Sequence, residues 1–253
     1  MPLEILPTRT GGAAENMAVD FLLLQRYPAT RANRPRFRHY DWRVPAFTFG
    51  YAQKISAVRE SLAAVEPPFE LCRRATGGGV VDHREDWTYT LVIPRGHPLE
   101  ELRATQSYRE IHAALAAALR AQGVAAALAA PAGSPAPERR DDSAEIPALP
   151  SQATADVCFT RAEIHDVVHA RSGAKIAGAA QKRNKRGLLF QGSIWRPAVG
   201  AVVDWDVFHD DFAARLAVAL EMEAQETPWP DLNEDEVGGL VEQYSSPEWM
   251  EFR

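Results

Sequence analysis

The stretch of residues 69–93 constrains the fold most, because it joins two strand-like runs through three consecutive glycines. Residues 69–74 and 87–93 have strand character, and the glycines at 77–79 lie between them. Glycine lets the backbone approach a bound molecule closely and point several N–H groups at it. The stretch is neither a P-loop nor a dinucleotide fingerprint, because it continues into a strand and not a helix. We therefore predict a hairpin whose glycine-rich loop can hold an anion or a carbonyl oxygen.

Two arginines precede the glycines. Three glycines alone are equally consistent with a flexible turn. Arg73 and Arg74 change that balance, because they place permanent positive charge where a carboxylate or phosphate would sit. The sequence therefore favours an anion-binding loop.

The composition is that of an ordinary globular protein. The chain has 253 residues, of which 46% are hydrophobic and 25% charged, and residues 1–253 are expected to form a single domain. No apolar run approaches the roughly 18 residues of a membrane span, and the first residues lack a signal-like pattern. We therefore expect a cytoplasmic protein that does not enter a membrane.

Charge and cysteine content exclude further classes. The net charge of −6 argues against nucleic-acid binding. No acidic residue occurs between Asp166 and Asp204, although this segment contains several lysines and arginines. Such a segment indicates an anion or an acidic partner. Cys72 and Cys158 are far apart and lack metal-ligand spacing, so we expect neither a disulfide nor a metal site.

The remaining chain alternates between helical and strand patterns. The expected helices are residues 14–25, 56–64, 107–128, 204–223 and 233–244, and further strands are expected within 37–50, 164–170 and 188–195. In the first helix Asp20 lies off the apolar stripe, and Asp204 can cap the fourth. Trp249 is expected to be exposed. The Pro- and Ala-rich residues 131–155 cannot bury enough apolar surface to adopt one conformation, so we predict a mobile loop.

Three side chains are candidates for chemistry. Cys158 follows the predicted loop and precedes the basic segment, whose charge could favour the thiolate, although a lone cysteine is often buried and inert. Lys175 is flanked by small residues and could reach an anion or polarise a carbonyl, or it could be a solvated lysine at a turn. His83 could shuttle a proton or be only a hydrogen-bonded core residue. Cys72 lies in an expected core strand and fits the inert alternative.

Two motifs taken together resemble the lipoate–protein ligase A and octanoyltransferase family. They are residues 73–83 (RRATGGGVVDH) and residues 175–183 (KIAGAAQKR). Supporting matches are residues 15–20 (ENMAVD), 40–42 (YDW) and 49–53 (FGYAQ). The matches follow the family's order over most of residues 14–200. The resemblance implies an α+β fold of mixed β-sheets flanked by helices, related to biotin protein ligases and class II synthetases, with an acyl tunnel between the two motifs.

The resemblance also assigns roles to residues. It implies that Lys175 contacts the acyl carbonyl or a phosphate. The residues that it places at the acyl or acyl-adenylate site are Arg73, Arg74, Thr76, Gly77, Gly78, Gly79, His83, Gly178, Ala179 and Gln181. The basic residues Lys182, Arg183, Lys185 and Arg186 would dock an acidic lipoyl carrier domain, of an E2 subunit or the glycine cleavage H protein, or would form a solvated loop.

The family divides by mechanism. Cysteine-dependent octanoyltransferases take octanoyl from acyl carrier protein and need no cofactor, and Cys158 stands where their nucleophile would be. Lipoate ligases use ATP and Mg²⁺ instead, and a third alternative is a module that only binds lipoyl domains. Gln191 departs from the family, since many members have histidine there, which leaves any acid–base role at that position open. The long loop before Cys158 is also unusual.

Overall fold

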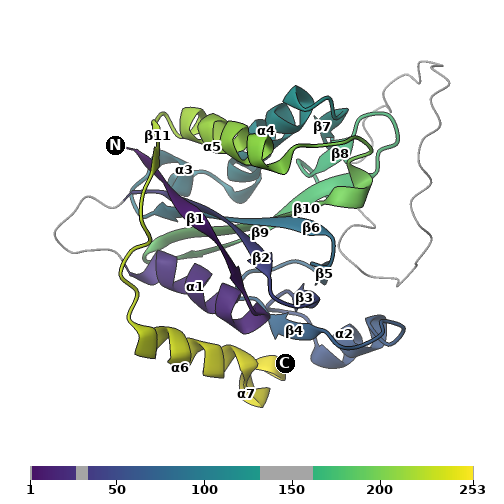
Figure 1. The fold of residues 1–253 in the computed structure, drawn as a ribbon, viewed down its shortest axis with the longest axis vertical. Coiled ribbons are helices and arrows are strands. Elements are labelled where there is room, and N and C mark those ends of the chain that lie inside the picture. Colours follow the sequence, from purple (N-terminus) through teal and green to yellow (C-terminus); the bar gives the residue numbers. More distant parts are fainter. Residues whose placement is uncertain (1, 27–33, 132–161, 253) are drawn as a thin grey trace.

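The computed structural model describes residues 2–26, 34–131 and 162–252. Its largest element is an eight-stranded sheet in which strands distant in sequence lie side by side (Figure 1). In spatial order the strands are β11 (Ala224–Glu226), β1 (Leu3–Gly11), β2 (Arg36–Trp42), β6 (Asp86–Pro94), β10 (Gly187–Trp195), β9 (Lys175–Asn184), β8 (Val167–His169) and β7 (Ala126–Leu128). The first two ladders are parallel and the other five are antiparallel. The predicted mixed sheet is confirmed.

Helices cover both faces of this sheet (Figure 1). On one face α4 (Ala104–Ala121) packs against α5 (Trp205–Ala219), and on the other α1 (Ala13–Gln25) lies between the sheet and α6 (Glu234–Ser245). Shorter helical segments are α2 (Ile55–Ser61), α3 (Pro98–Glu101), η1 (Arg196–Ala198) and α7 (Pro247–Met250). Within the described ranges, no helix is long and apolar enough to cross a membrane.

The central strands β6 and β10 are buried on both faces of the sheet. Successive side chains of a strand point to opposite faces, so Leu91 and Phe190 pack in the core under α4 and α5, whereas Val92 and Leu189 pack in the cluster that includes α1. Polar residues on such strands must be hydrogen-bonded, because leaving them buried without partners costs free energy. This requirement shapes the site described below.

A second sheet corrects the predicted hairpin. β4 (Glu70–Arg73) pairs with β3 (Ala46–Phe49), which also pairs with β5 (Val81–Asp82), whereas β6 belongs to the large sheet. The two runs around the glycines are therefore strands, but they do not pair with each other. The residue pattern favoured strands and contained no information on their partners. The glycine-rich loop therefore joins β4 to β5 within the second sheet, and residues 83–85 lead on to β6 in the large sheet.

Two other expectations also need correction. The helix predicted over 107–128 ends earlier, because Gly123 adopts a positive φ of 81° and the following residues form β7. Trp249 is half-buried and donates its indole N–H to the carbonyl oxygen of Arg73. The N-cap prediction is confirmed, since the Asp204 side chain accepts from the backbone N–H groups of Asp206 and Val207. The predicted mobile loop lies, beyond Pro131, outside the described residues.

Candidate functional site

A cavity of about 460 Å³ lies between the glycine-rich loop and strand β9. Arg74, Gly78 and Gly79 line it from the loop, and Lys175 and Gly178 line it from β9. Residues of the two motifs, far apart in the sequence, therefore face one space. The cavity is also lined by Met17, Tyr40, Thr48, Val81, His83, Thr88, Tyr108, Glu163, Ile164, Asp166, Ala179, Ala180, Gln191, Gly192 and Ser193.

Arg74 stabilises the glycine-rich loop where this loop lines the cavity. One guanidinium nitrogen donates to the carbonyl oxygens of Gly77 and Gly79 at 2.8 and 2.9 Å, and another donates to the Thr48 hydroxyl at 2.8 Å. Gly78 has a φ of 88°, which favours glycine. The positive charge of Arg74 thus stands at the cavity wall while its hydrogen bonds hold the loop's shape.

Arg73 points away from the cavity, contrary to its predicted place at the acyl site. Its guanidinium donates to the carbonyl oxygens of Tyr51, Gln53, Trp249 and Met250, at 2.7–2.9 Å. The physical reason is strand alternation, since neighbouring residues of a strand point to opposite sides. Arg73 therefore attaches the C-terminal helix α7 to β4.

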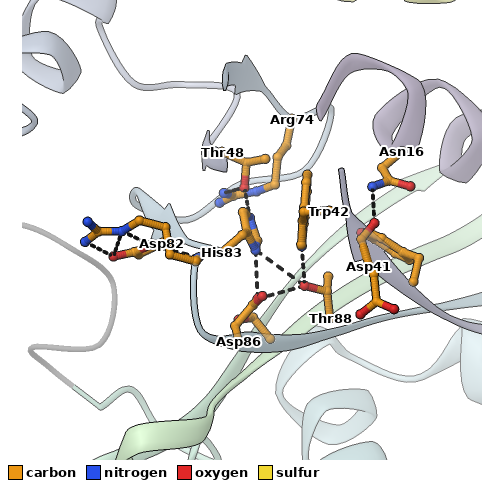
Figure 2. Close-up of polar contacts among 12 residues, drawn as sticks. Asn16, Asp41, Trp42, Thr48, Arg74, Asp82, His83, Asp86 and Thr88 are labelled. Carbon is orange, nitrogen blue, oxygen red and sulfur yellow. Dashed lines mark hydrogen bonds and ion pairs between the residues drawn. The ribbon is translucent and has the colours of Figure 1, made fainter. Parts of the chain in front are cut away.

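His83 belongs to a chain of hydrogen bonds that ends at Arg74 (Figure 2). Its Nδ1 lies 2.7 Å from Asp86 Oδ2 and its Nε2 lies 2.7 Å from Thr48 Oγ1, while its ring stacks on Trp42 with centroids 4.0 Å apart. A carboxylate oxygen accepts, so Nδ1 carries the hydrogen and Nε2 can accept from the Thr48 hydroxyl. Both ring nitrogens thus have partners within the protein, an arrangement that fits a positioning role.

Asp86 is a site residue that the sequence did not indicate. Besides His83, its Oδ2 accepts from the hydroxyls of Thr88 at 2.7 Å and Ser193 at 2.5 Å, and both of these residues line the cavity. Its other carboxylate oxygen, Oδ1, is buried and has no hydrogen-bond partner. The only available signal was a carboxylate three residues after a histidine, which is common.

On the opposite wall, Lys175 forms an ion pair with Asp166. Lys175 Nζ lies 2.7 Å from Asp166 Oδ2, and the two side chains are 10% and 9% exposed. The sequence indicated Asp166 only as the boundary of the acid-free segment. Lys175 itself is neither at a turn nor solvated, because it is the first residue of β9 and faces the cavity.

A second buried carboxylate lies beneath the cavity. Asp20 is fully buried, contrary to its predicted position off the apolar stripe, and pairs with Arg38 at 2.6 Å. It also accepts from the Tyr40 hydroxyl at 3.2 Å, the Thr90 hydroxyl at 2.7 Å and the Gln191 amide at 2.6 Å. Burial is the main cause that raises the pKa of the Tyr40 hydroxyl above its ordinary value, so this group remains a donor.

Gln191 connects this network to the glycine-rich loop. Its amide nitrogen donates to Asp20, and its amide oxygen accepts from the Thr76 hydroxyl at 2.7 Å. A side-chain amide does not titrate near neutral pH. Gln191 therefore supplies fixed hydrogen bonds and cannot itself act as an acid or base near neutral pH.

Lys175, predicted as catalytic, and the ten predicted substrate-binding residues divide into two groups. Seven of the predicted residues line the cavity, namely Arg74, Gly78, Gly79, His83, Lys175, Gly178 and Ala179. Four do not line it, namely Arg73, Thr76, Gly77 and Gln181. Gln181 faces α4, where its amide nitrogen donates to the Ala104 carbonyl oxygen at 3.2 Å. Thr76 is connected to the cavity through its hydrogen bond to Gln191.

The predicted docking residues lie along β9 and its turn, at increasing distance from the cavity. Lys182 Nζ lies 5.1 Å from the centre of the Tyr51 ring, and Arg183 donates to the Ser107 hydroxyl. Lys185 and Arg186 form the turn after Asn184. A strand advances roughly 3.3 Å per residue, so this turn is roughly 30 Å from Lys175. Carrier docking by these residues stays a prediction.

The two cysteines differ in what the structure describes. Cys72 is buried, and burial raises the pKa of its thiol to about 12, so it stays protonated and inert as expected. Cys158 lies outside the described residues. Its predicted role as nucleophile is therefore a proposal.

Comparison with protein families decides the relationship that these motifs indicate. The profile of the lipoyl protein ligase A/B catalytic domain matches residues 12–196. The chain belongs to this lipoyl ligase family. The matched range contains both cavity walls and ends one residue after β10.

Relatives of this lipoyl ligase family member include octanoyltransferases. The chain is 32% identical to octanoyltransferase LipM of Bacillus cereus over 181 residues, covering 72% of this chain and 60% of that protein. With LipM of an Exiguobacterium species it shares 31% identity over 212 residues, covering 83% and 70%. The alignment thus spans 60% of the length of the first of these relatives.

Solved structures confirm the predicted fold. The bipartite lipoate protein ligase of Thermoplasma acidophilum, studied with its E2 lipoyl domain, matches with a TM-score of 0.70 at 18% identity, covering 100% of this chain and 98% of that one. A lipoate–protein ligase A bound with ATP matches with a TM-score of 0.67 at 17% identity, covering 98% of each chain. At 17–18% sequence identity, the similarity to these structures concerns the fold of this lipoyl ligase family member alone.

Proposed function

We propose that this protein transfers an octanoyl or lipoyl group to a specific lysine of a lipoyl carrier domain, taking octanoyl from acyl carrier protein through a thioester on Cys158. The observation that carries the proposal is the meeting of both motifs on one cavity, with Arg74 and Lys175 on its walls. The names of the LipM relatives support octanoyl transfer. The carriers would be E2 lipoyl domains or the glycine cleavage H protein, and residues 1–253 would act as one cytoplasmic catalytic unit.

The reaction consists of two acyl transfers. The Cys158 thiolate attacks the donor carbonyl, a new carbon–sulfur bond forms, and the donor's own carbon–sulfur bond breaks to release acyl carrier protein as its thiol. The amine of the carrier lysine then attacks the enzyme thioester, so that an amide forms and Cys158 leaves and regains a proton. Each attack places negative charge on the carbonyl oxygen, which the Lys175 ammonium and backbone N–H groups of the loop would stabilise.

The rest of the site would keep these groups in position. Arg74 fixes the loop's carbonyl groups, and His83 holds Thr48, which in turn accepts from Arg74. Their hydrogen bonds are formed within the protein, so the loop needs little rearrangement when an acyl group enters. Such preorganisation lowers the barrier because no reorganisation is needed during the reaction.

An ATP-dependent lipoate ligase is the second candidate, favoured by the fold shared with the ATP-bound ligase. Arg74 and Lys175 would then neutralise the phosphate of lipoyl-AMP, which suits their charges and their place at the cavity. ATP would supply the activation of the free carboxylate, with Mg²⁺ beside its phosphates. Among the described residues there is no cluster of three His, Cys, Asp or Glu side chains suited to a metal ion.

One assay separates these functions. Octanoyl-acyl carrier protein without ATP, and free lipoate with ATP and Mg²⁺, are each incubated with protein and an E2 lipoyl domain or H protein. The mass of the carrier is then measured. Octanoylation without ATP supports the proposal, and modification only with lipoate and ATP supports the ligase. Carrier binding without any mass shift would indicate a module that only binds.

The nucleophile is tested with two matched serine variants. Cys158→Ser should abolish transfer from acyl carrier protein, because a serine hydroxyl is a far weaker nucleophile than a thiolate at neutral pH. Cys72→Ser should retain activity, since Cys72 is buried away from the cavity and remains protonated. Full activity of Cys158→Ser would refute the thioester step.

A further inference from the structure

Lys175 is held against the cavity wall by a carboxylate to which the sequence assigned no role. Its Nζ lies 2.7 Å from Asp166 Oδ2, and both residues line the cavity. A lysine side chain has four rotatable carbon–carbon bonds and loses rotamer entropy when it is fixed. Something must therefore keep the ammonium at the place where a carbonyl oxygen would bind.

Asp166 is itself fixed by the backbone around it. Its Oδ2 accepts from the backbone N–H of Glu163 at 2.8 Å, and its own backbone N–H donates to the Glu163 carbonyl oxygen at 3.0 Å. Its carbonyl oxygen accepts from the Ala129 backbone N–H at 2.7 Å. These hydrogen bonds fix the position of the Asp166 carboxylate. The Lys175 ammonium therefore takes its position from the carboxylate.

A buried histidine supports this turn from α4. His165, the residue before Asp166, has a φ of 68°, which is unfavourable for a side chain larger than glycine. His112 Nδ1 lies 2.6 Å from the His165 carbonyl oxygen. Since burial lowers the pKa of His112, its ring is neutral, and the hydrogen on Nδ1 is donated to this oxygen. The strained turn that presents Asp166 thus has a partner in the core.

Strand β9 leaves space for the lysine on the other side. Val167 pairs with Ala177 whereas Val168 pairs with Lys175, so one residue of β9 is extra and the strand bulges there. Such bulges redirect side chains. The end of Lys175 then lies over Gly178, where an added Cβ would be 2.6 Å from Lys175 Cε and 2.8 Å from Nζ. Any larger residue at 178 would displace the ammonium.

We propose that Asp166 is the positioning residue of the acyl-transfer site, and that it holds the Lys175 ammonium over Gly178 so that the ammonium faces the acyl carbonyl. The proposal rests on the function proposed above. An ammonium has three N–H donors, so the pair with Asp166 is compatible with donation to a substrate oxygen. Asp166 acts through Lys175 and does not touch the substrate.

The first test is a double-mutant cycle with octanoyl-acyl carrier protein and a lipoyl domain. Asp166→Asn keeps the side chain's shape and removes its charge, and it should lower kcat by about 10- to 100-fold with little change in KM, because misplacing a catalytic group by about 1 Å costs about that much. On a Lys175→Met background the same change should cost less than about twofold, since contacting residues are not additive. If Asp166→Asn lowers kcat by the same factor in the Lys175→Met background as in the wild type, the proposal is overturned.

Asp82→Asn is the matched control. Asp82 also carries a nearly buried carboxylate, with a side chain 8% exposed and paired with Arg84 at 2.6 Å, but it does not line the cavity. Its variant should keep kcat within about twofold of the wild type, as expected for changes away from the chemistry. An equal loss in Asp82→Asn and Asp166→Asn would mean a general effect of removing a buried charge and would contradict positioning.

Gly178→Ala tests the space under the lysine. The three heavy atoms nearest to the new Cβ are Cε and Nζ at the flexible end of Lys175 and an Asp166 oxygen. This variant should therefore melt within a few degrees of the wild type while losing kcat to an extent similar to Asp166→Asn. Wild-type kcat in Gly178→Ala would show that the position of the ammonium does not matter.

A measurement independent of activity separates this proposal from the proposed function. In protein labelled with ¹⁵N-lysine, Lys175 should give a slowly exchanging ammonium resonance, identified by its loss in Lys175→Met, and Asp166→Asn should remove it. If the wild type transfers no acyl group, the proposed function fails, while this resonance still supports the pair. A resonance that persists unchanged in Asp166→Asn overturns it.

Discussion

Two buried carboxylates near the cavity form ion pairs of similar length but differ in their surroundings. Asp20 has no exposed surface, and its oxygens accept from Arg38 and three further side chains. Asp166 lines the cavity, and its carboxylate accepts from Lys175 and one backbone N–H. The Asp20–Arg38 pair is enclosed by other side chains of the protein, whereas the Asp166–Lys175 pair faces a cavity that a substrate can enter. The same kind of ion pair therefore has a structural role at Asp20 and, in our proposal, a role in the reaction at Asp166.

The largest effect is expected from removing the cation of the enclosed pair. Arg38→Met leaves the Asp20 charge in the core without its counter-ion, and breaking a buried pair in this way costs about 3–5 kcal/mol of unfolding free energy. Urea unfolding followed by circular dichroism measures this loss. A loss below about 1 kcal/mol would mean that the hydroxyl and amide donors to Asp20 suffice, and the contrast between the two pairs would fail.

The link between Asp20 and the glycine-rich loop should have the next largest effect. Gln191→Leu removes a donor to Asp20 and the acceptor of the Thr76 hydroxyl, and leaving buried polar groups unpaired costs about 1–3 kcal/mol. Gln225→Leu on the exposed strand β11 is the control and should change stability by less than about 0.5 kcal/mol. Equal thermal shifts in both variants would show that Gln191 is not a structural link.

Low pH should destabilise the turn that holds Asp166, because His112 supports this turn. Burial lowers the pKa of this histidine in the folded protein, whereas in the unfolded chain its pKa is about 6.5. Its contribution to stability is therefore present above about pH 6.5 and is lost as the pH falls below that value. His112→Asn keeps a side-chain donor but cannot titrate, so its unfolding free energy should fall less steeply, by up to about 1.4 kcal/mol per pH unit.

This prediction is tested by urea unfolding of the wild type and of His112→Asn between about pH 5 and about pH 7, a range that spans the ordinary histidine pKa of about 6.5. Burial also lowers the pKa of His39, His97 and His169, and these residues are unchanged in the variant, so their contribution cancels in the difference. Parallel curves for the two proteins would exclude His112 as a proton-linked support of the turn.

The smallest stability effect is expected at the cavity pair. Lys175→Met should cost about 1 kcal/mol or less, because the Asp166 oxygen that loses the ammonium keeps its hydrogen bond from the Glu163 N–H and can be solvated by water entering the cavity. The same substitution should greatly reduce acyl transfer, so stability and activity respond separately. A stability loss equal to that of Arg38→Met would erase the distinction between the two carboxylates.

The sequence predicted the elements of the fold better than their partners. Residue pattern identified β4 and β6 as strands, but pairing depends on contacts between distant residues, so the two were wrongly joined in one hairpin. Strand alternation, had it been applied to Arg73 and Arg74, would have placed them on opposite sides. That principle alone would have removed Arg73 from the predicted site.

The site was predictable where motifs were long and contiguous. The glycine-rich loop and the lysine segment were expected to share a cavity, and the described residues place them there. The pattern placed Asp20 only off the apolar stripe of its helix, and its burial could not be predicted because its counter-ion, Arg38, belongs to another element. Asp166 and Asp86 lie in no motif that indicated a role for them. The role of a carboxylate depends on the side chains that the fold places next to it, and these cannot be read from the sequence.

The close contact of two glycines has a consequence for redesign of the cavity. The loop is held by Arg74 on one side, and on the other a side chain at Gly50 would overlap the carbonyl oxygen of Gly78. Engineers who wish to admit longer or bulkier acyl chains therefore have little freedom on this wall. Small changes at Met17 or Ala180, which also line the cavity, offer a way to alter its size without disturbing the loop.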